Sequence, residues 1–172
     1  MQPVQPTPQP TMSKPAPPPV HYAGFWRRFV AFLIDSTILC VVAFFFLIPA
    51  LGFLGLGIGA GALAEDPDAA AGLIVAAIAA YFFAIVIIAI AGWLYYAIME
   101  SSAKQGTLGK MALGIVVTDM DGKRISFGRA TGRYFGKILS GMILYIGYIM
   151  AGFTQKKQAL HDILASCLVV MR

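Results

Sequence analysis

"FWRRFVAFLIDSTILCVVAFFFLI", residues 25–48, places two arginines before a long apolar run and an aspartate inside it. A helix needs about 20 apolar residues to cross a bilayer core of about 30 Å. The stretch therefore predicts a transmembrane helix over 25–48, interrupted at Pro49. Arg28 and Asp35 are almost two helical turns apart and share one face of this helix, with Asp35 about 10 Å deeper.

The aspartate inside the apolar run needs a partner, because its insertion at mid-helix costs about 2.5–3.5 kcal/mol. We expect Asp35 to face the interior of a helix bundle, paired with Arg28 or with a cation from a later segment. The later candidates are Arg133, Lys137 and His161. A functional site and a structural pair that sets helix register are both compatible with this pattern.

The chain as a whole is too apolar for a soluble protein. Of its 172 residues, 59% are hydrophobic and 12% charged, whereas a soluble domain has about a quarter charged residues. We predict an all-α polytopic membrane protein with one membrane domain over 22–172 and a second, charge-free helix over 73–99. Residues 1–21 contain eight of the ten prolines, which predicts a flexible cytoplasmic tail.

A third apolar segment covers only 138–153. At about 1.5 Å per residue it spans roughly 24 Å, a marginal length for a membrane helix. A full third crossing and a re-entrant or interfacial segment both stay open. The chain closes with ALHDILASCLVVM, residues 159–171, which favours either a short helix or a helix that runs into a strand.

The polar connection over 100–137 follows the second predicted helix. Within it, GIVVTDMDGKRISF (114–127) predicts a small β-hairpin with strands at 115–117 and 125–127, separated by an Asp-Gly turn.

The basic residues predict a cationic helix and an orientation. Arg129, Arg133 and Lys137 are four residues apart and would form one stripe on a helix after the hairpin. The connection 51–72 has no Lys or Arg, whereas 100–137 has seven. Because basic residues near helix ends stay on the cytoplasmic side, we expect a bacterial inner-membrane protein with its N-terminus in the cytoplasm.

Three further polar residues lie near predicted helix ends. Glu100 closes the second helix, where we expect it to reach water, with weak support from an i,i+4 contact to Lys104. Asp162 follows His161. This pair favours either a proton relay, because histidine titrates near neutral pH, or a plain polar helix end at the membrane surface.

The motifs of catalytic and metal sites are missing from the sequence. GTLGKM (106–111) lacks the spacing of a P-loop, and Cys40 and Cys167 do not form a metal-binding pattern. We expect no cofactor, no metal and no enzymatic activity. The basic connection adjoins the membrane and has few aromatic residues, which favours anionic lipid headgroups over nucleic acid as its partner.

Three motifs in this order resemble the RDD family of small, mostly bacterial membrane proteins. They are GFWRRFVAFLID, ESSAKQGTLGKMALGIVVTDMDGKRISFGRATGRY and FTQKKQALHDILASCLVV. The resemblance covers about residues 22–171 and implies that Arg28, Asp35 and Asp162 are the family's characteristic arginine and two aspartates. Leu108 departs from the proline that is common in the family. The family is mostly uncharacterised, and cation–proton exchange has been proposed for some members.

Two functions follow as hypotheses. The first is a transporter, acting as a homo-oligomer, in which Asp35 and Asp162 bind protons or cations. The second is a non-catalytic membrane scaffold or assembly factor that binds a membrane partner protein and turns a basic cytoplasmic platform toward lipid.

Overall fold

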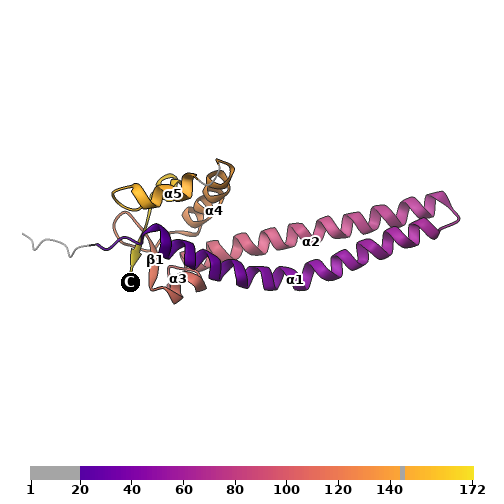
Figure 1. Ribbon diagram of the computed structural model, residues 1–172, viewed down its shortest axis with the longest axis horizontal. Helices are drawn as coiled ribbons and strands as arrows, with labels where there is room; N and C mark the ends of the chain where they lie inside the picture. Colours follow the sequence, from indigo (N-terminus) through magenta and orange to yellow (C-terminus); the bar gives the residue numbers. More distant parts are fainter. Residues whose placement is uncertain (1–19, 144–145) are drawn as a thin grey trace, which may run out of the picture.

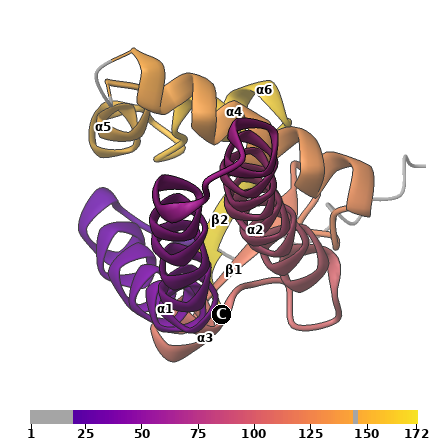
Figure 2. The same ribbon diagram turned by 90° about the vertical axis from the view of Figure 1, so that its right-hand side faces the viewer.

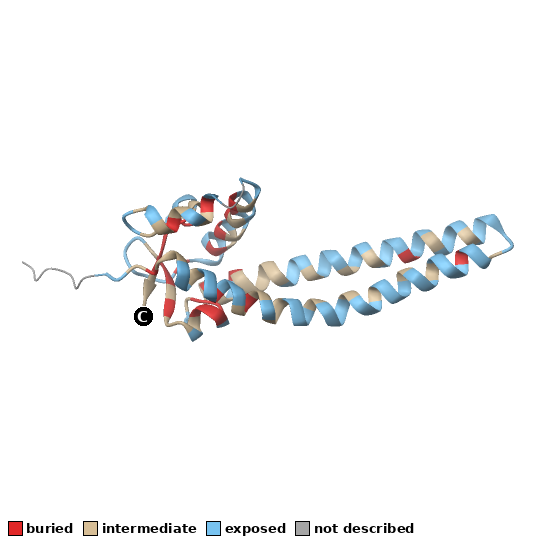
Figure 3. Ribbon diagram, viewed as in Figure 1, coloured by how far each residue is buried: buried red, intermediate tan, exposed pale blue. Residues whose placement is uncertain are grey.

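The computed structural model describes residues 20–143 and 146–172, and its main feature is a long antiparallel helical hairpin (Figure 1). Helix α1 (Phe25–Leu63) and helix α2 (Pro67–Ser101) are both long and apolar enough to cross a membrane. Along most of their length the side chains are exposed rather than buried (Figure 3). Such a surface is stable only in lipid or against another protein, so the predicted fold class, with two firm transmembrane helices, is confirmed.

Both helices are longer than the sequence predicted. Helix α1 continues through Pro49 and the glycine-rich stretch to Leu63, and α2 begins at Pro67 instead of residue 73. In lipid, a backbone group without an intrahelical bond has no water to replace it, so a helix continues through residues that would end it in water. The two helices are joined by a short turn in which the Asp66 carboxylate accepts a hydrogen bond from the Asp68 amide at 2.9 Å.

The glycines of α1 serve two different faces. A Cβ at Gly57 would overlap the Cβ of Ala77 on α2, and a Cβ at Gly61 would lie 2.8 Å from Ile74 Cγ1. These two glycines let the helices approach, as their spacing of four suggests. Gly55 and Gly59 have open space around them and lie on the outside of the hairpin.

The small sheet pairs segments from distant parts of the chain. Strand β1 (Ile115–Asp119) runs antiparallel to strand β2 (Cys167–Met171) at the C-terminal end. The predicted partner strand at 125–127 does not form. Only an isolated bridge joins Thr118 to Arg124, and helix α4 (Phe127–Met142) begins at once. The reason is local, because Ser126 accepts a hydrogen bond from the Arg129 amide and starts the helix.

The strand pairing also decides the topology. Strand β1 follows α2 through the short helix α3 (Leu108–Ala112), whereas β2 follows α5 (Ile146–Phe153) and α6 (Leu160–Leu164). Because β1 and β2 pair, the chain between them leaves and returns on the same side of the bilayer. The axes of α4 and α5 are also inclined by 103°. By length and composition this bent pair is either a broken span or a re-entrant loop. The pairing of β1 with β2 favours the re-entrant or interfacial alternative.

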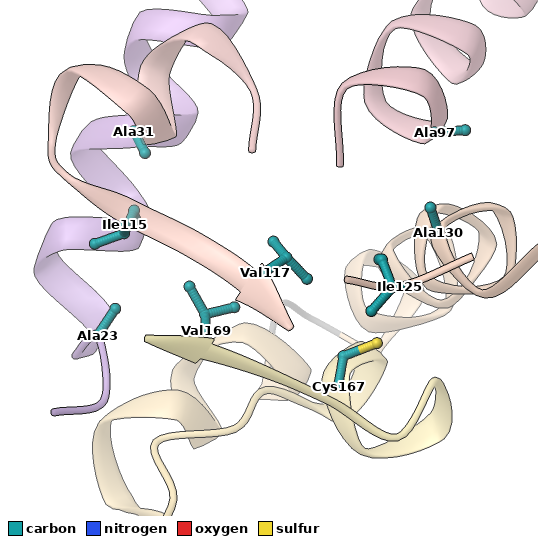
Figure 4. Packing of buried hydrophobic residues seen from close by; sticks show 9 residues of the cluster. All are labelled: Ala23, Ala31, Ala97, Ile115, Val117, Ile125, Ala130, Cys167 and Val169. Atoms are coloured by element: carbon teal, nitrogen blue, oxygen red, sulfur yellow. The ribbon is translucent and has the colours of Figure 1, made fainter. Parts of the chain in front are cut away.

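A compact base forms where α1 begins and α2 ends. The Ala23 amide donates to the Val169 carbonyl at 2.9 Å, which ties the start of α1 to β2. Around the sheet, nine buried residues pack together (Figure 4). They are Ala23, Ala31, Ala97, Ile115, Val117, Ile125, Ala130, Cys167 and Val169. This core joins the start of α1 and the end of α2 to the two strands and to α4. The charged residues lie beside it.

Candidate functional site

A network of buried charges connects five helices, α1, α2, α3, α4 and α6, at the base of the hairpin. It consists of Arg28, Glu100, Lys110, Arg133, Lys137 and Asp162, and we call it the charge network. Arg133 on α4 is at its centre and only 2% exposed. Its Nη1 lies 2.6 Å from Glu100 Oε2, and its Nη2 lies 2.7 Å from Asp162 Oδ1. One guanidinium thus joins the end of α2 to the C-terminal helix α6.

The second oxygen of Glu100 binds lysines. Lys110 Nζ lies 2.6 Å from Glu100 Oε1, and Lys137 Nζ lies 3.4 Å from the same atom and 3.9 Å from the centre of the Tyr96 ring. Glu100 is buried. The expectation that it reaches water beside Lys104 is therefore wrong, because α3 and α4 bring cations to it that are distant in sequence.

The predicted cationic stripe exists on α4, but it faces the protein interior. Arg133 and Lys137 point into the charge network, and only Arg129 of the three stays largely exposed, 4.0 Å from Asp119. A Cβ at Gly136, between them on this face, would make a tight contact of 3.1 Å with the Cβ of His161 on α6. Arg133 and Lys137 thus form an internal link between helices. Other basic residues of the connection, namely Lys104, Lys123, Arg124 and Arg129, remain exposed, and their contact with lipid headgroups stays a prediction.

Arg28 binds Asp162 instead of Asp35. Its Nη1 forms an ion pair with Asp162, and its Nε donates to the Ala23 carbonyl at 2.9 Å. Asp162 is fully buried and also accepts from the Ala159 amide at 3.1 Å, at the start of α6. Both arginines therefore hold the C-terminal helix on the hairpin, and the predicted Arg28–Asp35 pair is wrong.

Asp35 is only 1% exposed, as expected for a carboxylate kept away from lipid, but its partners are neutral. Its Oδ1 accepts from the Tyr95 hydroxyl and the Gly109 amide, each at 2.8 Å, and its Oδ2 accepts from the Thr107 hydroxyl. The ion pairs among the described residues include none to Asp35, so Arg133, Lys137 and His161 are not its partners either.

Gly109 makes the Asp35 site possible. A Cβ at this position would overlap the carbonyl oxygen of Ala31 and crowd the Asp35 carboxyl group. The missing side chain lets the start of α3 approach α1 closely enough for its backbone amide to bind the carboxylate. The Tyr95 hydroxyl closes the site from α2 and also accepts from the Leu108 amide at 3.1 Å.

The electrostatics of the base fit a structural role for Asp162 and His161. Burial would raise the pKa of Asp162, but Arg133 and Arg28 outweigh it and hold the pKa well below its usual range. Burial lowers the pKa of His161 well below its usual value, so the ring is neutral at physiological pH. A charged histidine relaying protons to Asp162 is therefore not favoured by this geometry.

Cations outnumber carboxylates in the charge network, with four against two. Lys110 is the group that responds to this imbalance. Burial and then the nearby Arg133 lower the pKa of Lys110 to about 7, although Glu100 acts in the opposite direction. A lysine that releases its proton near neutral pH reduces the excess positive charge without breaking its hydrogen bond to Glu100.

Most residues of this site were predicted from the sequence, but their pairing was predicted incorrectly. The structure brings Arg28, Glu100, Arg133, Lys137 and Asp162 together, with His161 beside them, and sets Asp35 apart. It adds Thr107, Gly109 and Lys110, all from the GTLGKM segment, and Tyr95 from α2. The only sequence signal in this segment is a Gly-Lys pair after the second predicted helix, and such a pair does not by itself predict which side chains it contacts.

Comparison with known proteins places these features in context. The sequence profile of the RDD family matches residues 22–166. The uncharacterized protein YxaI of Bacillus subtilis (strain 168) is 40% identical over 152 residues, which cover 87% of this chain and 97% of the relative. The uncharacterized membrane protein YteJ of the same organism is 32% identical over 155 residues, covering 87% and 80%. No solved structure matches the chain significantly.

Proposed function

This chain belongs to the RDD family of membrane proteins, and on that premise we propose that it is a non-catalytic scaffold or assembly factor of the bacterial inner membrane. In this role the hairpin holds the protein in the bilayer and offers its outer faces to a second copy or to a membrane partner. The base presents a folded module on the cytoplasmic side.

The observation that carries this proposal is the distribution of charge along the hairpin. Between Asp35 and Glu65, and again between Asp68 and Glu100, the sequence has no charged residue. An ion path across a bilayer is normally lined by polar or charged groups. A homo-oligomer would add only more copies of the same apolar helices. A binding role requires only that these helices provide apolar contact surfaces.

The outer face of α1 suits such contacts. Gly55 and Gly59 lie one turn apart on the outside and have open space around them. Small residues at this spacing let another membrane helix approach closely, which is the main source of helix association in lipid. The inward pair, Gly57 and Gly61, is already used against α2. The outward pair supports the binding of a second copy or partner helix.

The orientation follows from the same charges. The turn between the spans is acidic, with Glu65, Asp66 and Asp68, while the base contains the basic residues of 100–137. The positive-inside rule then places the base in the cytoplasm. We expect a green fluorescent protein fused after Arg172 to fluoresce in intact bacteria, because that reporter folds in the cytoplasm but not when exported through the general secretion pathway. Alkaline phosphatase inserted at Glu65 should be active and serves as the opposite control. A dark C-terminal fusion with an inactive phosphatase would contradict the orientation.

A specific observation favours transport as the second candidate. Asp35 is a buried carboxylate that forms no ion pair among the described residues, and it shares its site with the hydroxyl oxygens of Tyr95 and Thr107. Oxygen ligands of this kind suit hard cations. Asp162 lacks this property because both its oxygens already bind arginines. A transporter would therefore use Asp35 alone in each copy.

One experiment separates the two candidates. The purified protein is reconstituted into liposomes that contain a pH-sensitive dye, and a sodium or potassium gradient is applied. As a scaffold, the protein should move protons no faster than protein-free liposomes. Cation-driven proton flux that disappears in Asp35→Asn, at equal folded amounts, would overturn the scaffold proposal and establish exchange. Arg129→Gln, at an exposed position away from Asp35, is the matched control and should behave like the wild type.

A further inference from the structure

Helix α4 has its apolar and charged faces reversed relative to a soluble helix. Its buried face contains Arg133, Gly136 and Ser140, with Lys137 at the edge. Its outward face contains large apolar side chains, with Phe135 55% and Met142 77% exposed. Ile138 and Leu139 lie on the same outward face. A surface helix in water shows the opposite pattern.

The depth of α4 along the hairpin shows which way the apolar face points. The rings of Phe127 and Phe135 pack against Trp93, at centroid distances of 6.0 and 6.4 Å. Arg133, on the other face, binds Glu100. Trp93 is seven residues before Glu100 and hence about 10 Å closer to the hairpin tip. The apolar face therefore points toward the membrane-spanning part and the charged face toward the base.

The direction of α4 fits the plane of a membrane surface. In Figure 2 the long helices α1 and α2 are seen end-on, and α4 runs across the view beside them. It is thus roughly perpendicular to the spans and lies where α2 ends (Figure 1). Trp93, Tyr95 and Tyr96 occupy the same level of α2, and such aromatic residues are enriched at the boundary between headgroups and acyl chains.

We propose that α4 is an in-plane membrane helix whose face of Phe135, Ile138, Leu139 and Met142 is seated in the cytoplasmic leaflet. The occupant of this face is bilayer lipid, because the face is continuous with the exposed surface of the hairpin and points into the same layer. Arg133 and Lys137 point away from the lipid and hold α4 on the base from inside. Apolar insertion by about 5–10 Å provides the anchor. This requires a membrane-spanning hairpin with its base oriented as proposed above, and it is independent of the scaffold role.

The test uses spin labels on the full chain in liposomes of phosphatidylcholine and phosphatidylglycerol. Single cysteines are introduced as Leu139→Cys and Met142→Cys on the apolar face, and as Lys123→Cys and Arg124→Cys in the exposed turn before α4. Cys40 is exposed and is replaced by alanine. Cys167 can stay, because burial raises the pKa of its thiol to about 11 and keeps it unreactive in the folded protein. Collision with oxygen and with a water-soluble nickel complex is then measured at each label.

The expected result is a ratio of oxygen to nickel accessibility at residues 139 and 142 that is severalfold higher than at 123 and 124. Equal ratios at all four sites would place α4 in water and overturn the proposal. Exclusion of both reagents at 139 and 142, with spin–spin broadening between copies, would show that protein covers this face and would also overturn it. The turn labels report, in the same samples, that the base is folded and accessible to water.

Discussion

Replacing Arg133 by methionine is expected to destabilise the base by about 3–5 kcal/mol, the usual cost of removing one partner of a buried ion pair. Methionine fills much of the arginine's volume but leaves Glu100 and Asp162 without their shared cation. Both carboxylates are fully buried and cannot turn to water. Lys110 and Lys137 still compensate Glu100, and Arg28 still compensates Asp162, so the loss should be severe but need not abolish insertion of the hairpin.

The measurement uses the buried thiol of Cys167 as a reporter. This residue belongs to the core beside the charge network and is inaccessible in the folded state. In a Cys40→Ala background, a thiol-reactive dye reports the temperature at which the base opens. Arg129→Met is the matched control on the same helix, because that side chain is exposed and should change stability by less than about 0.5 kcal/mol. Equal midpoints for the two variants would contradict the structural role of Arg133.

Replacing Asp35 by leucine is expected to cost about 2–4 kcal/mol, because buried donors without acceptors each lose about 1–3 kcal/mol. Three groups lose their acceptor, namely the Tyr95 and Thr107 hydroxyls and the Gly109 amide. The hydroxyls can rotate toward other acceptors, but the amide belongs to the backbone and cannot. Asp35→Asn keeps one oxygen acceptor and should cost clearly less, as measured by the same thiol reaction. Equal stability of the leucine variant and the wild type would show that these hydrogen bonds contribute nothing.

A double-mutant cycle makes this second prediction sharper. Arg28→Met and Asp35→Asn should add within about 0.5 kcal/mol, because these residues share no contact. Arg28→Met and Asp162→Asn should not be additive, because the two side chains form an ion pair. Non-additive effects at Arg28 and Asp35, with additive effects at Arg28 and Asp162, would instead support the Arg28–Asp35 pair that was predicted from the sequence.

The parts of the structure that the sequence predicted well depend on local properties. The two spans follow from the length of uninterrupted apolar sequence, which needs no knowledge of partners. The α4 stripe follows from residues four apart on one helix. The start of α1 at Phe25 was predicted correctly, but its end was not, because Pro49 and the glycines stop helices in water but not in lipid. The hairpin predicted at 114–127 does not form because Ser126 starts α4, and β1 pairs instead with β2 at the other end of the chain.

What the sequence by itself determined is the membrane class, two long helices and a set of charges gathered near one end of them. Only the tertiary structure decided which charges meet, because the partners are far apart in the chain, as with Arg28 and Asp162. Helical periodicity shows only which residues share a face of one helix, and on that basis Arg28 and Asp35 were predicted to pair. Helix α3 instead brings a backbone amide to Asp35, and α3 and α4 bring cations to Glu100. No local sequence pattern indicates those approaches.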